Sequence, residues 1–136
     1  MNPETQDAKS RREGSGSTDR LLPATSGTFD ALVLKGKGPI AVEFMSYGCS
    51  HCRVLEPILQ HVAEKLESKE KIFRVNTAVE QKLAEQYSVK GTPTVVMFLN
   101  GKEVGRAEGP PPTVSSLLTA LTHPFESNAP ARAAKA

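Results

Sequence analysis

The chain has 136 residues, of which 38% are hydrophobic and none is tryptophan, so it is long enough for one compact domain with some unstructured sequence beside it. Its 17 basic and 15 acidic residues leave a formal charge of +2, which gives no reason to expect a nucleic-acid surface or adsorption to anionic lipid. The two cysteines are too few for a small secreted scaffold with several disulfides, so any thiol chemistry must be local.

The ends of the chain differ in composition from its middle. Residues 1–19 mix acidic and basic side chains with Gly and Ser, and residues 126–136 are similarly polar or small. We predict that both segments are disordered and that one domain occupies residues 20–125. The N-terminal segment lacks the apolar run of a secretory signal, and no run reaches the roughly 20 apolar residues of a membrane span. A cytoplasmic protein without membrane contact is therefore expected.

Within residues 20–125, helical and strand patterns alternate in chain order. The spacing of apolar residues predicts a short helix over 28–36. A continuous apolar run over 40–45, interrupted only by Glu43, predicts a strand that is covered on both faces. An additional edge strand over 19–25 is disfavoured by Pro23.

An amphipathic helix is predicted to follow from Cys49, because the apolar residues after it recur at helical spacing. A strand over 71–77 and a helix over 79–89 come next. Residues 92–109 predict a β-hairpin that turns at Asn100-Gly101, and residues 113–121 predict a last helix that ends before Pro124. The expected order is helix, strand, helix, strand, helix, strand, strand, helix.

Both cysteines lie in the stretch SYGCSHC, at residues 46–52. They could form a reactive pair, part of a metal site with His51, or simply two small buried residues. The metal interpretation needs a fourth ligand, and His61 and His123 are far from the motif in the chain, so it is disfavoured. We therefore predict no metal site.

Five features together resemble the thioredoxin family over residues 21–125. They are Glu43 six residues before Cys49, the C-x-x-C spacing of Cys49 and Cys52, Pro57, Gly-Thr-Pro at residues 91–93, and the turn at Asn100-Gly101. The resemblance implies the α/β thioredoxin fold, with a central mixed sheet of four or five strands flanked by helices. It also implies thiol chemistry without a bound cofactor.

The two cysteines are expected to have different roles. A cysteine in the first turn of a helix faces unpaired backbone N–H groups and the positive end of the helix dipole, so its thiolate is favoured. Cys49 is therefore predicted to be the nucleophile. Cys52, one turn further along the helix, is predicted to keep its proton and later to resolve the mixed disulfide.

Two further residues are predicted to take part in catalysis. A partly positive imidazole at His51, or an added N–H donor, beside Cys49 would stabilise the thiolate and raise the reduction potential above about −270 mV. The motif is in this respect similar to dithiol oxidases of the DsbA type; a solvated histidine with little effect is the alternative. Glu43 stands where the family has a buried acid, and we expect it to accept the proton of Cys52 through water. The alternative is a strand-edge glutamate that points to solvent. Arg74 aligns with a family lysine near that acid and either tunes Glu43 or is a surface charge.

The resemblance also implies a substrate-binding rim. In the family the bond before Pro93 is cis, and the backbone of Thr92 is expected to pair with an extended substrate segment. Gly91 and Gly109 would let that segment approach closely, or would serve only as turn residues. Gly48, which replaces the usual tryptophan, and Ser50 complete the predicted rim.

We therefore expect a monomeric enzyme that reduces protein disulfides, with disulfide-containing proteins as substrates and a disulfide reductase or another thiol donor as its source of electrons. A dithiol oxidase or isomerase of more oxidising potential is the first alternative. A binding or chaperone module with the same fold but without redox activity is the second.

Overall fold

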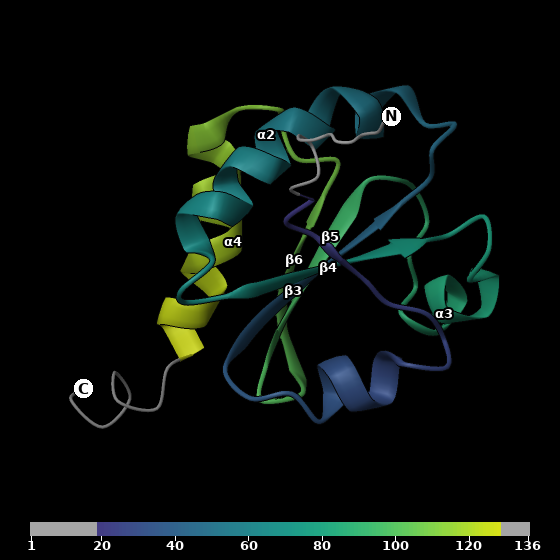
Figure 1. Ribbon diagram of the computed structural model, residues 1–136, viewed down its shortest axis with the longest axis horizontal. Coiled ribbons are helices and arrows are strands. Elements are labelled where there is room, and N and C mark those ends of the chain that lie inside the picture. Colours follow the sequence, from purple (N-terminus) through teal and green to yellow (C-terminus); the bar gives the residue numbers. More distant parts are fainter. Residues whose placement is uncertain (1–18, 129–136) are drawn as a thin grey trace, which may run out of the picture.

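A five-stranded sheet with helices on both sides forms the centre of the molecule in the computed structural model, which describes residues 19–128 (Figure 1). The predicted disorder of residues 1–18 and 129–136 lies outside the described residues and stays a prediction. Asp19, which was assigned to the disordered segment, is described and forms side-chain hydrogen bonds. The domain therefore begins at least one residue earlier than predicted.

The sheet is mixed. Its strands lie in the order β2 (Leu22–Pro23), β4 (Lys71–Asn76), β3 (Pro39–Met45), β5 (Thr94–Leu99) and β6 (Lys102–Glu108). The first three strands are parallel to one another, whereas β5 and β6 are antiparallel to their neighbours. The predicted mixed sheet of an α/β domain is confirmed, with five strands.

Strand β3 is buried on both faces, as its apolar run predicts. Ala41 belongs to the core under helices α2 (Ser50–Leu66) and α4 (Val114–Asn128), while Val42 and Phe44 belong to the core on the other face. Because side chains alternate along a strand, Glu43 lies on the same face as Ala41. The acid in this strand is therefore directed toward α2.

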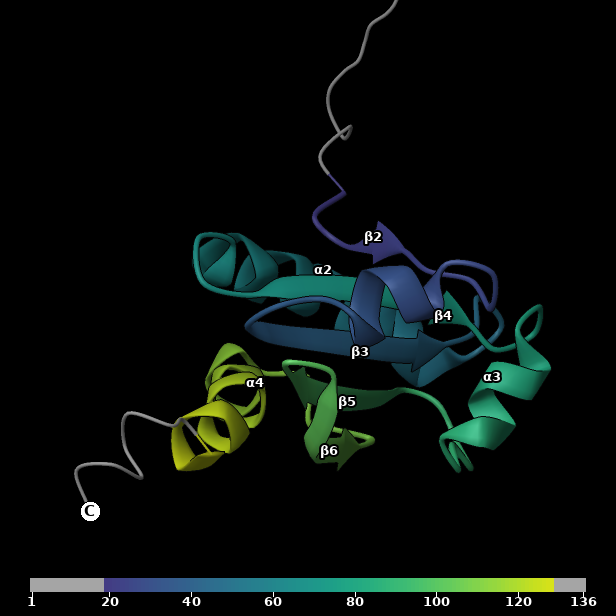
Figure 2. The same cartoon turned by 90° about the horizontal axis from the view of Figure 1, so that it is seen from below.

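The helices cover both faces of the sheet. Helices α2 and α4 contact each other on one face (Figure 1). The short π-helix η1 (Asp30–Leu34) and helix α3 (Gln81–Gln86) supply buried residues to the core on the opposite face, and Figure 2 shows α3 well away from α2 and α4. The predicted order is confirmed from the first helix to the last, although α3 is shorter than predicted and the strand β2 precedes η1.

Helix α4 continues through Pro124 to Asn128, although the sequence predicts that it ends before this proline. Pro124 packs over Gly105 of β6, where a Cβ atom would lie 2.9 Å from Cβ and Cγ of Pro124. Phe125, one residue further, is buried in the core. Burial of Phe125 therefore offsets the hydrogen bond that proline cannot make, and the helix passes the predicted boundary at residue 125.

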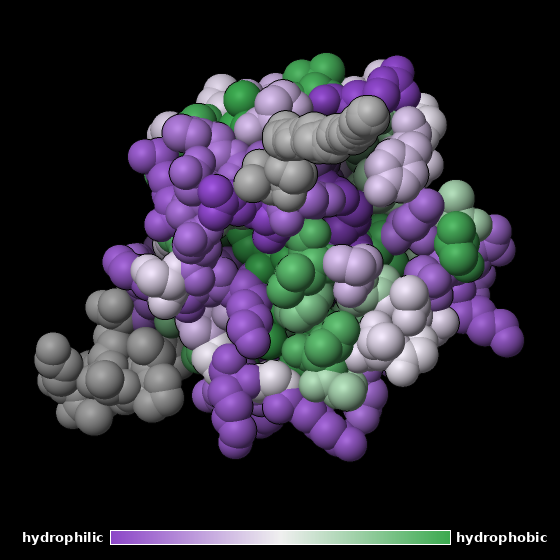
Figure 3. All heavy atoms as spheres, viewed as in Figure 1, coloured by the Kyte–Doolittle hydropathy of each residue, from purple (hydrophilic) through white to green (hydrophobic). Residues whose placement is uncertain are grey.

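The sequence disfavours an edge strand at residues 19–25, but the structure has a short one, β2. Pro23 is tolerated there because β2 has a neighbouring strand on one side only. Leu22 of β2 and Leu32 of η1 are exposed, and Figure 3 shows an apolar area on this face with hydrophilic side chains around it. Within residues 19–128, no helix is both long enough and apolar enough to span a bilayer.

The β5–β6 hairpin turns at Asn100-Gly101, as predicted. Both residues have positive φ, 52° and 87° respectively, which is the conformation of a two-residue hairpin turn. A side chain at Gly101 would also collide with the carbonyl oxygen of Leu34, so glycine is required here for space as well as for conformation.

Candidate active site

The cysteine pair lies where the central strand meets helix α2. Strand β3 ends at Met45, and after a turn Cys49 forms the N-cap of α2 with φ −86° and ψ 117°. Its sulfur accepts a hydrogen bond of 3.1 Å from the backbone N–H of Cys52. Cys49 is half-buried and Cys52 is buried. The sequence thus placed Cys49 correctly at the start of the helix.

The surroundings of Cys49 favour its thiolate. Burial opposes ionisation, but hydrogen bonds from the side chains of Cys52 and Thr92 and from the backbone of Cys52 and His51 outweigh it and lower the pKa of Cys49. These donors include the free N–H groups that open a helix.

The surroundings of Cys52 favour its thiol. Burial, followed by its hydrogen bond to Cys49, raises the pKa of Cys52 to about 11. Its side chain is 2% exposed, so a charge on this sulfur would be poorly solvated. The two thiols therefore differ in the way that a nucleophile and a resolving thiol must differ.

The loop before β5 faces Cys49. The peptide bond between Thr92 and Pro93 is cis, and the thiol of Cys49 lies 3.4 Å from the carbonyl oxygen of Thr92. The backbone N–H of Gly109 donates a hydrogen bond of 2.8 Å to the carbonyl oxygen of Pro93. These contacts join residues from two loops around one sulfur.

A groove of about 340 Å³ adjoins this loop. Its lining includes Gly91, Thr92, Pro93 and Gly109. Apart from Gly91 itself and its two neighbours in the chain, no described residue has an atom within 4 Å of a Cβ placed there, so the space beside it is open. Gly109 has a φ of 56°, which favours glycine in a turn. Gly48 and Ser50 are exposed on either side of Cys49. All six predicted rim residues thus lie in or next to the loops around Cys49.

The ring of His51 has its hydrogen-bond partner in the loop after β6. Its Nε2 lies 3.0 Å from the carbonyl oxygen of Pro110, which can only accept, so Nε2 carries the proton of this hydrogen bond. The ring also lies close to Gly109, since a Cβ there would be 3.8 Å from its Cε1. His51 contributes to the lowered pKa of Cys49 through its backbone N–H. Stabilisation of the thiolate by its imidazole ring stays a prediction.

Glu43 is fully buried beneath α2, which excludes the alternative that it points to solvent. Neither of its carboxyl oxygens has a hydrogen-bond partner among the described residues. Burial, followed by the negative charge of Glu56, raises the pKa of Glu43 to about 8, while Arg74 opposes this shift. The group can therefore gain and lose a proton near neutral pH.

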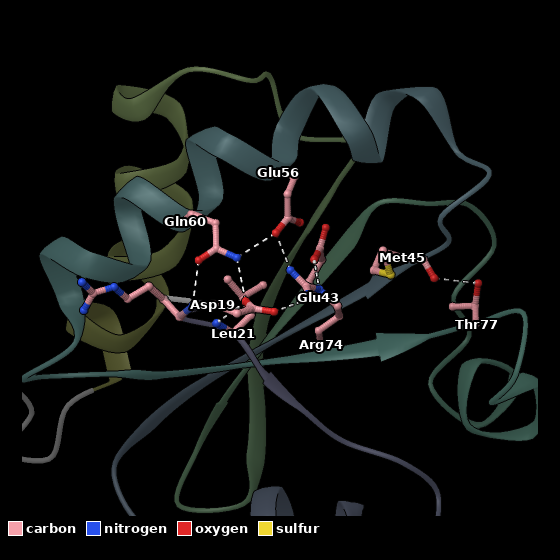
Figure 4. A network of polar contacts seen from close by, with 9 residues as sticks. Asp19, Leu21, Glu43, Met45, Glu56, Gln60, Arg74 and Thr77 are labelled. Carbon is pink, nitrogen blue, oxygen red and sulfur yellow. Dashed lines mark hydrogen bonds and ion pairs between the residues drawn. The ribbon is translucent and has the colours of Figure 1, made fainter. Parts of the chain in front are cut away.

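Arg74 connects Glu43 with two carboxylates nearer to solvent (Figure 4). Its guanidinium donates hydrogen bonds to Asp19, at 2.9 Å, and to Glu56, whereas its Nε lies 3.9 Å from Glu43. Gln60 donates to both outer carboxylates, each at 2.7 Å. The alternative of a surface charge is excluded, because the side chain of Arg74 is 12% exposed.

Sequence reasoning missed Asp19, Glu56 and Gln60. Glu56 and Gln60 follow Cys52 by four and eight residues, and this helical spacing, which the sequence does show, places them on one side of α2. Asp19 gave no such signal, because it precedes the first apolar residues of the domain.

A cavity of about 160 Å³ lies beside the pair and is lined by Cys52, Glu56 and Arg74, together with Met45, Ser46, Tyr47 and Arg53. No three His, Cys, Asp or Glu side chains between residues 19 and 128 are grouped so that they could hold a metal ion.

The family model and the relatives found by comparison with known proteins are all thioredoxins. The family model described as Thioredoxin matches residues 20–122. The chain is 36% identical over 85 residues to thioredoxin Y, chloroplastic, of Oryza sativa subsp. japonica, covering 62% of this chain and 51% of that protein. It is 35% identical over 79 residues to a thioredoxin of Rickettsia bellii, covering 58% of this chain and 75% of that protein. It is 31% identical over 99 residues to thioredoxin 1 of Nostoc sp., covering 73% of this chain and 92% of that protein. The chain thus spans about half the length of the rice protein and most of the Nostoc protein.

Proposed function

Because the chain belongs to the thioredoxin family, we propose that it is a thiol–disulfide oxidoreductase that reduces protein disulfides through Cys49 and Cys52. One observation carries the proposal: the sulfur of Cys49 caps helix α2 and accepts the backbone N–H of Cys52, while Cys52 is buried one turn away. This arrangement favours a nucleophilic thiolate at Cys49 and a protonated resolving thiol at Cys52.

In the first step, the Cys49 thiolate attacks one sulfur of a substrate disulfide. A bond forms between Cys49 and that sulfur, the substrate S–S bond breaks, and the other substrate sulfur leaves as a thiolate that takes a proton from water. The hydrogen-bond donors at the helix start favour the attacking thiolate.

In the second step, Cys52 releases the substrate. Its thiol gives a proton to the carboxylate form of Glu43, and the resulting thiolate attacks the sulfur of Cys49. The Cys49–Cys52 disulfide forms, the mixed disulfide breaks, and the substrate leaves as a second thiol after it takes up a proton. The raised pKa of Glu43, about 8, makes it a stronger base than an ordinary carboxylate, and its loss of the proton later restores the site.

The substrate is proposed to lie in the groove beside Thr92 and Pro93. An extended peptide placed there would bring its disulfide toward Cys49, which lies 3.4 Å from the carbonyl oxygen of Thr92. The open space at Gly91 gives its backbone room to approach. The enzyme would act as a monomer, and a disulfide reductase or another thiol donor in a reducing compartment such as the cytoplasm would return the pair to the dithiol.

A more oxidising role, as a dithiol oxidase or isomerase, is the second candidate. The backbone N–H of His51 is among the donors that lower the pKa of Cys49, and a more stable thiolate makes the disulfide a better oxidant. A reduction potential above that of ordinary thioredoxin, about −270 mV, would favour this role.

Reduction of insulin by dithiothreitol, followed by turbidity, tests the reductase proposal. The protein should accelerate precipitation, Cys49→Ser should lose the acceleration, and the exposed control variant Ser68→Ala should keep it. Cys52→Ser should instead accumulate a mixed disulfide on Cys49, which a non-reducing gel detects. Equal acceleration by Cys49→Ser would contradict the proposal and favour a module without redox activity.

A further inference from the structure

The guanidinium of Arg74 gives its hydrogen bonds to two outer carboxylates and none to the buried acid beside it. Its two Nη atoms donate to Asp19 and Glu56, while its Nε has no hydrogen-bond partner among the described residues and lies 3.9 Å from Glu43. A guanidinium typically binds a carboxylate through two parallel hydrogen bonds. Glu43, although it is the neighbouring residue across the β3–β4 pair, receives none.

The two outer carboxylates are themselves held in place. The side-chain amide of Gln60 donates to Asp19 and to Glu56, each at 2.7 Å, so that it bridges them (Figure 4). The backbone N–H of Leu21 donates a further hydrogen bond of 3.0 Å to Asp19. The position of the guanidinium is therefore determined by contacts from helix α2 and from the segment before β2.

We propose that Asp19 and Glu56 are positioning residues for Glu43: they hold the guanidinium of Arg74 toward the outside of the site and out of hydrogen-bonding contact with the buried carboxyl. The inference rests on the proposed function, in which Glu43 exchanges a proton with Cys52. Hydrogen bonds from Arg74 would stabilise the carboxylate and make it a weak base. Held apart, the carboxyl group remains basic enough to take the proton of a thiol.

The charged and titratable groups around Glu43 come from every side of the site. Those that act on its charge are Cys49 at the N-cap of helix α2, Glu56 on α2, Arg74 on β4 and Asp19 before β2, whereas the residue paired with Glu43 on β5 is the apolar Val95. Burial raises the pKa of Glu43 most, and the charges of Glu56, Cys49 and Asp19 raise it further; the charge of Arg74 alone lowers it. Any change that lets Arg74 approach Glu43 must therefore lower this pKa.

Titration of the Glu43 carboxyl carbon by NMR in the full-length dithiol protein tests the inference. In Glu56→Gln, which keeps the shape of the side chain but not its charge, the midpoint of Glu43 should fall by about one pH unit. Asp19→Asn should act in the same direction with a smaller shift, because Asp19 is more exposed. The control Glu64→Gln, on the same helix but in contact with Arg20, should leave the midpoint unchanged.

The same titration in an Arg74→Gln background separates positioning from simple charge. If Glu56 acts by holding Arg74, Glu56→Gln should lower the Glu43 midpoint by less than half as much when Arg74 is absent. An equal fall in both backgrounds would overturn the inference, because Glu56 would then act only through its own charge. An unchanged midpoint in both Glu56→Gln and Asp19→Asn would overturn it as well.

Insulin reduction by the same variants keeps the two proposals distinguishable. The titration reports on Glu43 whether or not the protein turns over. Shifted midpoints in a protein that does not reduce insulin would refute the proposed function and support the positioning of Arg74. Normal insulin reduction with unshifted midpoints would support the function and overturn the positioning.

Discussion

Two glutamates, Glu43 and Glu70, are buried to a similar extent but have different charged and reactive groups around them. Each is at most 6% exposed, each has a carboxyl oxygen without a hydrogen-bond partner among the described residues, and burial raises the pKa of each to about 8. Glu43 lies beneath the start of α2, whereas Glu70 lies just before β4.

The difference between them lies in the groups around the carboxyl. Burial is the one cause that raises the pKa of Glu70, and its neighbouring cavity of about 140 Å³ is lined by Arg20, Glu67 and Lys71 but by no thiol. Around Glu43, the charges of Glu56, Arg74 and Cys49 also act. A raised pKa therefore identifies a buried acid, and the reactive group beside it is what makes the acid useful for catalysis.

Substitution of each glutamate by glutamine should show which of the two takes part in catalysis. Glu43→Gln should slow the release of substrate from the mixed disulfide by on the order of 10²-fold at pH 7, because Cys52 loses its proton acceptor. Glu70→Gln should leave this rate unchanged. Rapid-quench measurement of the mixed disulfide would follow the step directly, and equal rates in the two variants would remove the proposed role of Glu43.

The two glutamates should affect the pH dependence of the free energy of unfolding in the same way. In the unfolded chain each carboxyl ionises near pH 4.3, whereas in the folded chain each keeps its proton to about pH 8. Between these values the folded state binds more protons, so the free energy of unfolding should fall as pH rises, by about 1.4 kcal/mol per unit for each group.

Glu70→Gln should therefore be more stable than the unaltered protein by a few kcal/mol at pH 8 and equally stable near pH 4. Urea unfolding at both pH values measures this. A free energy of unfolding that does not depend on pH over this range in the unaltered protein would show that neither carboxyl is held protonated by burial.

The smallest effect is expected at His51, whose backbone and ring have different partners. His51→Pro removes the N–H that helps to lower the pKa of Cys49, and it should lower the reduction potential by tens of millivolts. His51→Ala keeps this N–H and loses only the hydrogen bond to Pro110, so its potential should change less. Equilibration with glutathione measures both; a larger change in His51→Ala would assign the effect to the ring.

The sequence predicted those parts of the site that depend on local pattern. Glu43 interrupts an apolar run, which indicates burial, and the helical periodicity after Cys49 places this residue at a helix start. The parts that depend on contacts distant in the chain were not predictable in this way. The ring of His51 binds a residue 59 positions away, and Asp19 and Arg74 are 55 positions apart. Pro124 is tolerated inside α4 because Gly105, on another element, leaves room for it.

Site-resolved alkylation tests the central claim most directly. The dithiol protein is treated with limiting iodoacetamide between pH 5 and about pH 11, and mass spectrometry measures the rate at each cysteine. Cys49 should react much faster than Cys52 at pH 7, with a midpoint below the value of about 8.5 for a free thiol, and Cys52 should become reactive only near pH 11. Equal rates at both sulfurs, with one shared alkaline midpoint, would contradict the account.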